Sequence, residues 1–190
     1  MNDLEFSPQM LMGKRLPPYQ ILKVLEDGGN LIALADWAVA GDALAVDTSV
    51  LYSVRGGTSI ILATDADKSA NAYCDFINDR NRGDLTAYAH DWVYGWFYFT
   101  PASLLYLGSY FQMLLGLSDM SKFMYKNFTP GGLVSGWNIL KFDLDNPTGN
   151  IGAFDLSSTT LLRVEHDQVA GNTHDFTIYL GYVAFVRPLK

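Results

Sequence analysis

Charged residues are scarce in this 190-residue chain, and no stretch of it is strongly basic. They make up 17% of the sequence, with 13 Lys and Arg against 20 Asp and Glu, which gives a formal net charge of −7. Proteins that bind nucleic acid neutralise phosphates with a concentrated basic face. The sequence therefore predicts a protein without a nucleic-acid partner.

Cysteine and long apolar runs are lacking as well. Cys74 is the single cysteine, so the chain cannot form an internal disulfide. The longest apolar stretch, residues 104–117, spans about 14 positions with polar and glycine interruptions, short of the roughly 20 that a bilayer span requires. Residues 1–6 are acidic and lack the basic and apolar regions of a secretory signal. We therefore expect a protein that is made in a cytoplasm and does not enter a membrane.

The sequence also lacks the motifs of common catalytic and metal sites. His90, His166 and His174 show neither HxH nor HExxH spacing, which argues against zinc. There is no Gly-x-Ser-x-Gly elbow and no glycine-rich phosphate loop. Asp143 and Asp145 are two residues apart, but they enter a turn, where acidic side chains commonly bond to the local backbone. We expect no catalytic residues and a protein that is not an enzyme.

What the chain has in abundance is apolar and aromatic surface. Hydrophobic residues make up 49% of the sequence and aromatic residues 14%. A domain of this size buries roughly 70% of the surface that its unfolded chain exposes, which is enough for a core without disulfide or metal staples. We expect an N-terminal arm over residues 1–20 and a single domain over residues 21–190.

The arm carries a Pro17–Pro18 pair, which forces an extended backbone rather than a helix. Two alternatives remain open for it. The arm packs on its own domain or frays at the terminus, or it is a tether that adds to an exposed sheet edge of a partner. The candidate partner-binding residues are Met10, Leu11, Met12, Arg15, Leu16 and Tyr19.

From residue 21 onward, short β-type runs alternate with turns rich in Gly, Asn, Asp and Pro. Residues 136–144 alternate as a half-buried antiparallel strand does, with Asn138 on the exposed side. Residues 176–186 fit a closing strand with its even-numbered side chains on one face, whereas residues 118–127 look like a polar excursion. Residues 31–39 and 104–117 fit a helix or strands equally well. The pattern predicts an all-β protein, a two-sheet antiparallel β-sandwich of the jelly-roll kind. The further strands are expected at residues 21–25, 43–46, 50–54, 59–63, 92–100 and 158–165.

Tryptophan and phenylalanine are concentrated in the second half of the chain. We expect those after Trp92 to seal the two stacked sheets together, with Trp96 and Trp137 as core anchors. Trp37 and Trp92 are less constrained by the pattern. They are the candidate ligand-binding tryptophans.

Five short motifs in order carry a family resemblance. They are Glu26-Asp27-Gly28, Gly57-Thr58-Ser59-Ile60, Gly95-Trp96-Phe97-Tyr98-Phe99, the strand at residues 136–144 and the strand at residues 176–185. The succession resembles the jelly-roll modules in structural proteins of tailed bacteriophages. Those modules are similar in turn to carbohydrate-binding and concanavalin-like sandwiches. The resemblance covers residues 21–187, but its motifs consist of core and turn residues, so it implies a fold more directly than a function.

The resemblance implies a non-enzymatic structural component of a phage virion, such as a capsid decoration, a fibre or an accessory tail protein. Its partners would be other virion proteins and further copies of itself, and it would be assembled in the host cytoplasm. The alternative is a carbohydrate-binding module that recognises host surface glycans, and a glycoside hydrolase or lyase of the same fold ranks last. No cofactor is expected, apart from a structural calcium ion of the kind such sandwiches hold. Glu26 and Asp27 match the first part of that metal site, whereas Gly181 stands where an Asp is usual.

Overall fold

The computed structural model describes residues 19–27, 37–41, 43–49, 52, 58–64, 73–172 and 174–189. Strands make up most of this part of the chain. Its helices are short: the α-helix α2 (Pro101–Leu105) and the 3-10 helices η3 (Thr86–Tyr88) and η4 (Pro130–Gly132). In these ranges no helix has both the length and the apolar character needed to span a membrane. The strands are β1 (Tyr19–Glu26), β2 (Trp37–Gly41), β3 (Ala43–Ser49), β4 (Ser59–Thr64), β5 (Tyr73–Asn78), β6 (Trp92–Phe99), β7 (Leu107–Gly116), β8 (Phe123–Phe128), β9 (Gly136–Asp143), β10 (Gly149–Ile151), β11 (Leu161–Gln168) and β12 (Thr177–Pro188).

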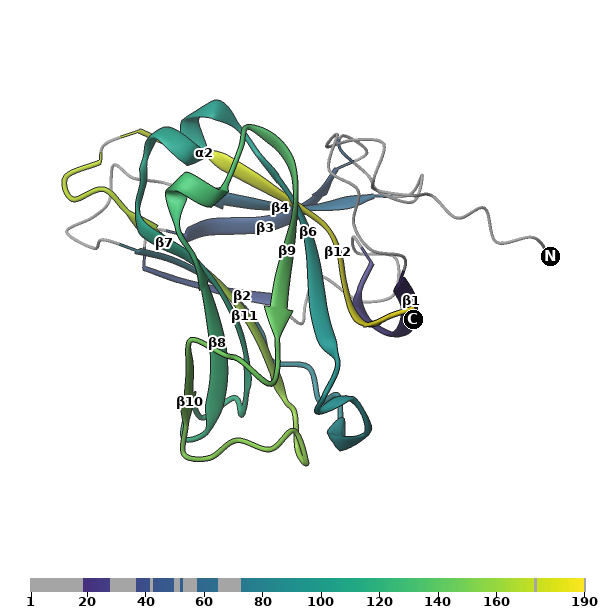
Figure 1. Cartoon of the computed structure of the whole chain (residues 1–190). Coiled ribbons are helices and arrows are strands. Elements are labelled where there is room, and N and C mark those ends of the chain that lie inside the picture. The colour runs from purple at the N-terminus through teal and green to yellow at the C-terminus, as the bar shows by residue number, and fades with distance from the viewer. Residues whose placement is uncertain are drawn as a thin grey trace.

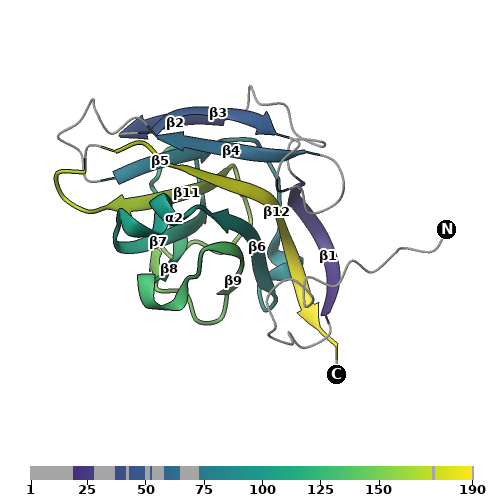
Figure 2. The ribbon, with the colours of Figure 1, turned by 90° about the horizontal axis from the view of Figure 1, so that it is seen from above.

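The strands form two six-stranded sheets. The first sheet has the order β3-β4-β12-β6-β9, and β1 also pairs with β12, beside its C-terminal end (Figure 1). The second sheet has the order β10-β8-β7-β11-β5-β2. Neighbouring strands pair antiparallel, and the two sheets are stacked, as the view from above shows (Figure 2). The predicted all-β, two-sheet antiparallel sandwich is confirmed.

Strand β6 shows how the sequence builds two different surfaces at once. Its odd-numbered residues, Val93 to Phe99, face the core between the sheets, and its even-numbered residues, Trp92 to Tyr98, face away from it. The prediction that the phenylalanines seal the sheets is right, because Phe97 and Phe99 are fully buried in the main core. For the tryptophans it is wrong: Trp96 and Trp137 belong to a separate cluster on the outer face of the first sheet. The period of two that β structure imposes separates the two ring types.

Strand β9 corrects the expectation for Asn138. Its side chain is buried on the inner face, whereas Trp137 and Ile139 lie outward. The Asn138 amide holds the preceding loop: Oδ1 accepts from the Val134 N–H at 3.0 Å, and Nδ2 donates to the carbonyls of Val134 at 2.6 Å and Gly136 at 3.0 Å. These three bonds offset the cost of burying a polar side chain.

Strand β12 does not keep one face along its length. Its pairing with β6 shifts register between Leu180 and Tyr182, which marks a bulge at that point. Ile178 and Leu180 therefore face the core before the bulge, and the odd-numbered Val183 and Phe185 face it afterwards. The predicted continuous face of even-numbered residues is wrong beyond Leu180, because the extra residue moves the later side chains to the opposite side.

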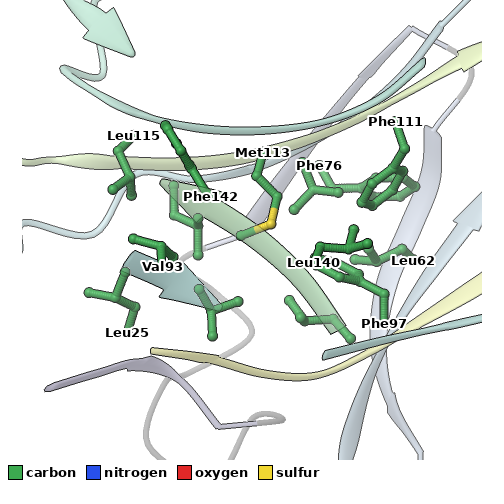
Figure 3. Close-up of a cluster of buried hydrophobic side chains, with 14 of the residues drawn as sticks. Leu25, Leu62, Phe76, Val93, Phe97, Phe111, Met113, Leu115, Leu140 and Phe142 are labelled. Carbon is green, nitrogen blue, oxygen red and sulfur yellow. The ribbon is translucent and has the colours of Figure 1, made fainter. Parts of the chain in front are cut away.

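The main core is filled by side chains from both sheets (Figure 3). The Phe97 ring of the first sheet meets the Phe111 ring of the second sheet edge to face, with centroids 4.9 Å apart. Met113 and Phe142 are buried beside them, and so is Cys74, the single cysteine. Sheet-to-sheet contacts of this kind, rather than any staple, hold the sandwich together.

In several segments the observed secondary structure differs from the predicted one or decides between the alternatives left open. The polar excursion predicted for residues 118–127 contains β8, an edge-proximal strand whose mixed composition hid its alternation. Residues 104–117 divide into the end of α2 and the whole of β7. In the segment left open at residues 31–39, the described part begins β2 at Trp37. The strand predicted at residues 50–54 lies outside the described residues except for Tyr52.

Replacing Phe97 by Ala tests the sheet-to-sheet packing. We expect Phe97→Ala to lower the free energy of unfolding by about 3–5 kcal/mol, because it removes a fully buried ring and leaves a cavity. Val134→Ala, at a side chain that is 51% exposed, should change it by no more than about 0.5 kcal/mol. Urea denaturation measures both variants, and a loss below about 1 kcal/mol for Phe97→Ala would contradict this packing.

Candidate functional site

A row of polar side chains crosses the outer face of the second sheet. Glu165 of β11 pairs with Asp75 of β5 on one side and with Gln112 of β7 on the other, and Gln112 pairs with Asn127 of β8. The residues that flank them along β5, β7 and β11 are buried in the sandwich, so these side chains point away from the core. The antiparallel register thus aligns four carboxylate and amide groups from four neighbouring strands.

Arg163 links this row into a network. Its guanidinium donates from Nε to Asp75 Oδ1 at 2.8 Å and from one terminal nitrogen to Asp75 Oδ2 at 2.6 Å. The same nitrogen donates to Glu165 Oε2 at 2.5 Å, and the Tyr110 hydroxyl donates to Glu165 Oε1 at 2.6 Å. Bidentate charge-assisted bonds of this geometry are strong and directional. The two carboxylates are therefore held in fixed positions around one cation.

The electrostatics of the network follow from two acids sharing one guanidinium. Burial, the largest effect, raises the pKa of Asp75 from 3.8 to about 6, and the Arg163 charge, which lowers the pKa, compensates only in part. The neighbouring Glu165 raises the pKa of Asp75 further. Burial and the bond to Glu165 also raise the pKa of Tyr110, so its hydroxyl remains a donor.

The carboxylates of the polar row are largely shielded from solvent. Asp75 is 5% exposed and Glu165 is 8% exposed, although both point outward from the sheet. Tyr73, on the same face and next to Asp75 along β5, is 38% exposed. The outer surface therefore combines sheltered hydrogen-bonding groups with accessible tyrosine rings.

Tyr125 of β8 sits one row from the polar groups, paired with Leu114 of β7 and with Gly149 of β10. A Cβ built on Gly149 would lie 2.5 Å from the Tyr125 ring, so the ring lies directly against the glycine backbone. Any larger residue at position 149 would push the ring aside. The glycine of the edge strand thereby sets the position of the half-buried ring.

This arrangement suits the recognition of a polar ligand with apolar ring faces. Carboxylates accept hydrogen bonds, and amides and the guanidinium donate them, while tyrosine rings offer flat apolar surface with a polar tip. Bond cleavage by two carboxylates needs them on either side of the scissile bond. Asp75 and Glu165 instead bind the same nitrogen of Arg163.

The two candidate ligand-binding tryptophans lie elsewhere. Trp37 is 9% exposed in the main core, so the accessible ring expected of it is wrong: as the first residue of β2 it packs inward. Trp92 is half-buried on the outer face of the first sheet, on the opposite side of the sandwich from the polar row. Lys141 Nζ lies 3.3 Å from the centroid of the Trp92 ring, a cation–π contact that takes up one face of it. A ligand-binding role for Trp92 stays a prediction.

Of the candidate partner-binding residues, Met10, Leu11, Met12, Arg15 and Leu16 lie outside the described residues. Tyr19 begins β1, and its ring packs on its own domain, with centroids 5.2 Å from Tyr94 and 6.2 Å from Trp96. For this one residue of the arm, the structure follows the alternative in which the arm packs on its own domain.

Glu26 and Asp27 lie at the end of β1, and the Asp27 N–H donates to Glu26 Oε1 at 2.9 Å. Glu26 is buried and pairs with Val183, two residues beyond Gly181 in β12. In the part of the chain that the structure describes, no group of three or more His, Cys, Asp or Glu side chains is placed to hold a metal ion. A calcium ion at Glu26 and Asp27 stays a prediction.

The sequence reasoning missed the polar row and its network. The signal was present in β11, where Arg163, Glu165 and Asp167 alternate with the apolar or buried Leu162, Val164 and His166. Charged residues at every second position of a strand whose other face is core mark the outer face of a sheet. Asp75 and Gln112 carry no such local signal, because only the register of β5 and β7 brings them beside Glu165.

Comparisons with known proteins find similar folds but no similar sequences. No protein-family model and no curated protein sequence matches the chain. The fold is similar to a structure from a study of promiscuous specificity in carbohydrate-binding modules of the β-sandwich superfamily (TM-score 0.57, 10% identity, 84% of this chain and 60% of that chain). It is similar to a family 11 carbohydrate-binding module from Clostridium thermocellum, solved with a β-1,3-1,4-mixed-linked tetrasaccharide (TM-score 0.55, 10% identity, 90% of this chain and 96% of that chain).

A third similar structure is an exo-β-agarase (TM-score 0.55, 11% identity), of which the match covers 89% of this chain and 25% of that chain. The chain therefore spans 60% of the first of these three structures and a quarter of the agarase. At 10–11% identity, the likeness shows the sandwich fold.

The Arg163 network predicts a specific pH dependence of stability. The folded chain binds the Asp75 proton more tightly than the unfolded chain does, because the pKa is about 6 rather than 3.8. The stabilisation that this proton contributes is complete below about pH 4 and is lost as the pH rises through about 6. Between pH 4 and 7, the unfolding free energy of the wild type should therefore fall relative to that of Asp75→Asn. Urea denaturation at several pH values measures the difference, and a constant difference would contradict the raised pKa.

Proposed function

We propose that this protein is a non-catalytic carbohydrate-binding module that holds a neutral glycan on the outer face of its second sheet. The observation that carries the proposal is the sheltered network of Asp75, Arg163 and Glu165, with the Tyr125 ring fixed one row away. Sugars present hydroxyls that need both donors and acceptors, and apolar ring faces that stack on aromatic side chains. The similar fold of known carbohydrate-binding modules supports this proposal.

Charge narrows the class of glycan. Asp75, Glu165 and Asp167 all lie on this face of the sheet, and Arg163 is the cation that meets the first two. A surface with three carboxylates and one guanidinium disfavours an acidic polysaccharide, because like charges brought together cost free energy. The proposed ligand is therefore a neutral polysaccharide or oligosaccharide.

The virion role that the sequence resemblance implied remains a prediction, as do the virion partners, self-association and the cytoplasmic site of assembly. None of the three similar structures above is described as a virion protein. A glycan-binding module is compatible with a virion part that contacts a host surface. The glycan proposal does not depend on that setting.

Binding to soluble polysaccharides tests the proposal directly. In affinity gel electrophoresis, we expect β-1,3-1,4-glucan, xylan or galactomannan to retard the wild type and polygalacturonate to leave it unretarded. Tyr125→Ala should weaken binding at the polar row at least tenfold, which corresponds to about 1.4 kcal/mol, because it removes the stacking ring, and the variant should be retarded less than the wild type.

Tyr106→Ala is the matched control, since that ring stacks on His174 at 5.1 Å, at the connection between α2 and β7. It should bind as the wild type does. A wild type that no neutral polysaccharide retards would refute the proposal, as would a Tyr125→Ala variant that is retarded as strongly as the wild type. Release of new reducing ends during incubation would instead indicate a hydrolase.

A further inference from the structure

The outer face of the first sheet carries a second row that the polar network does not explain. The register pairs Asp47 of β3 with Ile61 of β4, Ile61 with Tyr179 of β12, Tyr179 with Tyr98 of β6, and Tyr98 with Trp137 of β9. One residue from each of five neighbouring strands therefore lies on a line perpendicular to the strands. We call these five residues the aromatic row.

Tyr98, the central ring of the aromatic row, contacts the two other rings. The Tyr98 ring meets Trp137 edge to face, with centroids 5.8 Å apart, and Tyr179 edge to face at 6.1 Å. Tyr52 adds a fourth ring, stacked on Tyr98 with centroids 3.7 Å apart. These contacts fix the rings relative to one another, so a ligand meets a preformed surface.

The rings of the aromatic row keep part of their surface exposed beside Tyr52, which packs on Tyr98 at 3.7 Å and on Tyr179 at 4.7 Å. The neighbouring rings of the same face are covered. Tyr94 is 1% exposed and Trp96 is 3% exposed. In contrast, Tyr98 and Trp137 are half-buried and Tyr52 is 39% exposed. Aromatic rings left accessible together at one end of a sheet cost free energy unless something binds there.

We infer that the aromatic row is a second glycan-binding surface, on the opposite side of the sandwich from the polar row. Its ligand is a β-linked chain of neutral pyranoses that lies across the strands. Neighbouring strands are about 4.8 Å apart, so Tyr179 and Trp137, two strands apart, are separated by about 10 Å. That separation suits one disaccharide repeat of an extended chain, with a pyranose face on each ring and Asp47 accepting from hydroxyls at one end.

A glycan fits this row better than a protein partner does. A stable protein interface buries about 800 Å² on each side, which requires a surface much wider than one row of side chains. The row also lacks the cation that an acidic ligand would need, since its one charged residue is Asp47. The inference shares its ligand class with the proposed function but none of its residues, so each can fail without the other.

The consequence is a module with two glycan sites on opposite faces. Isothermal titration with a β-1,3-1,4-linked glucan hexasaccharide and with cellohexaose tests this. We expect the wild type to bind two hexasaccharides per chain. The double variant Trp137→Ala, Tyr179→Ala should bind one, and Tyr125→Ala on the other face should also bind one, because each change removes one site. If the double variant does not unfold cooperatively, Ile61→Glu replaces it, with the same expected result.

The outcomes separate the two claims. If the double variant binds as the wild type does and Tyr125→Ala loses all binding, the inference is wrong and the proposed function stands. If the double variant loses all binding and Tyr125→Ala loses none, the aromatic row stands and the polar row fails. A change in molar mass of the double variant in light scattering, without a change in hexasaccharide binding, would assign the row to contacts between copies and overturn the inference.

Discussion

Every second side chain of a strand must point to the opposite face of its sheet, and this constraint decides how the aromatic residues of the protein are used. In β6, phenylalanine occupies the core positions, while tryptophan and tyrosine occupy the outer ones. Phenylalanine has no polar atom to satisfy inside the sandwich, whereas indole and phenol groups do. The bulge of β12 extends this outer aromatic surface from β6 to β12, because it places Tyr182 on the outer face beside Trp96.

The two outer faces that result differ in chemistry. One presents a hydrogen-bonded network in which a single guanidinium orders two acids and a phenol. The other presents rings that hold one another in place, and its charged side chains, such as Lys141 and Asp47, lie beside the rings rather than in a network. Both are built on paired strands rather than loops, so their geometry is as rigid as the sheets themselves.

The sequence predicts the fold well because the fold depends on local signals. Alternation at residues 136–144 and turns rich in glycine, asparagine and proline are enough to indicate a two-sheet sandwich. The side of each strand that faces inward is harder to predict, as Asn138 and Trp96 show, because the sequence does not reveal which of two apolar faces meets the other sheet. Of the polar row, only the members on β11 leave a signal in the local sequence. Asp75 and Glu165 are 90 positions apart, and only the pairing of β5 with β11 joins them.

The close approach of Tyr125 to Gly149 makes one position of the edge strand β10 sensitive to substitution. Even an alanine there would place its Cβ 2.5 Å from the ring, so the ring would have to move. A single methyl group on β10 would therefore change the surface of β8 without altering any member of the polar network. The requirement for glycine at this position comes from a neighbour on another strand.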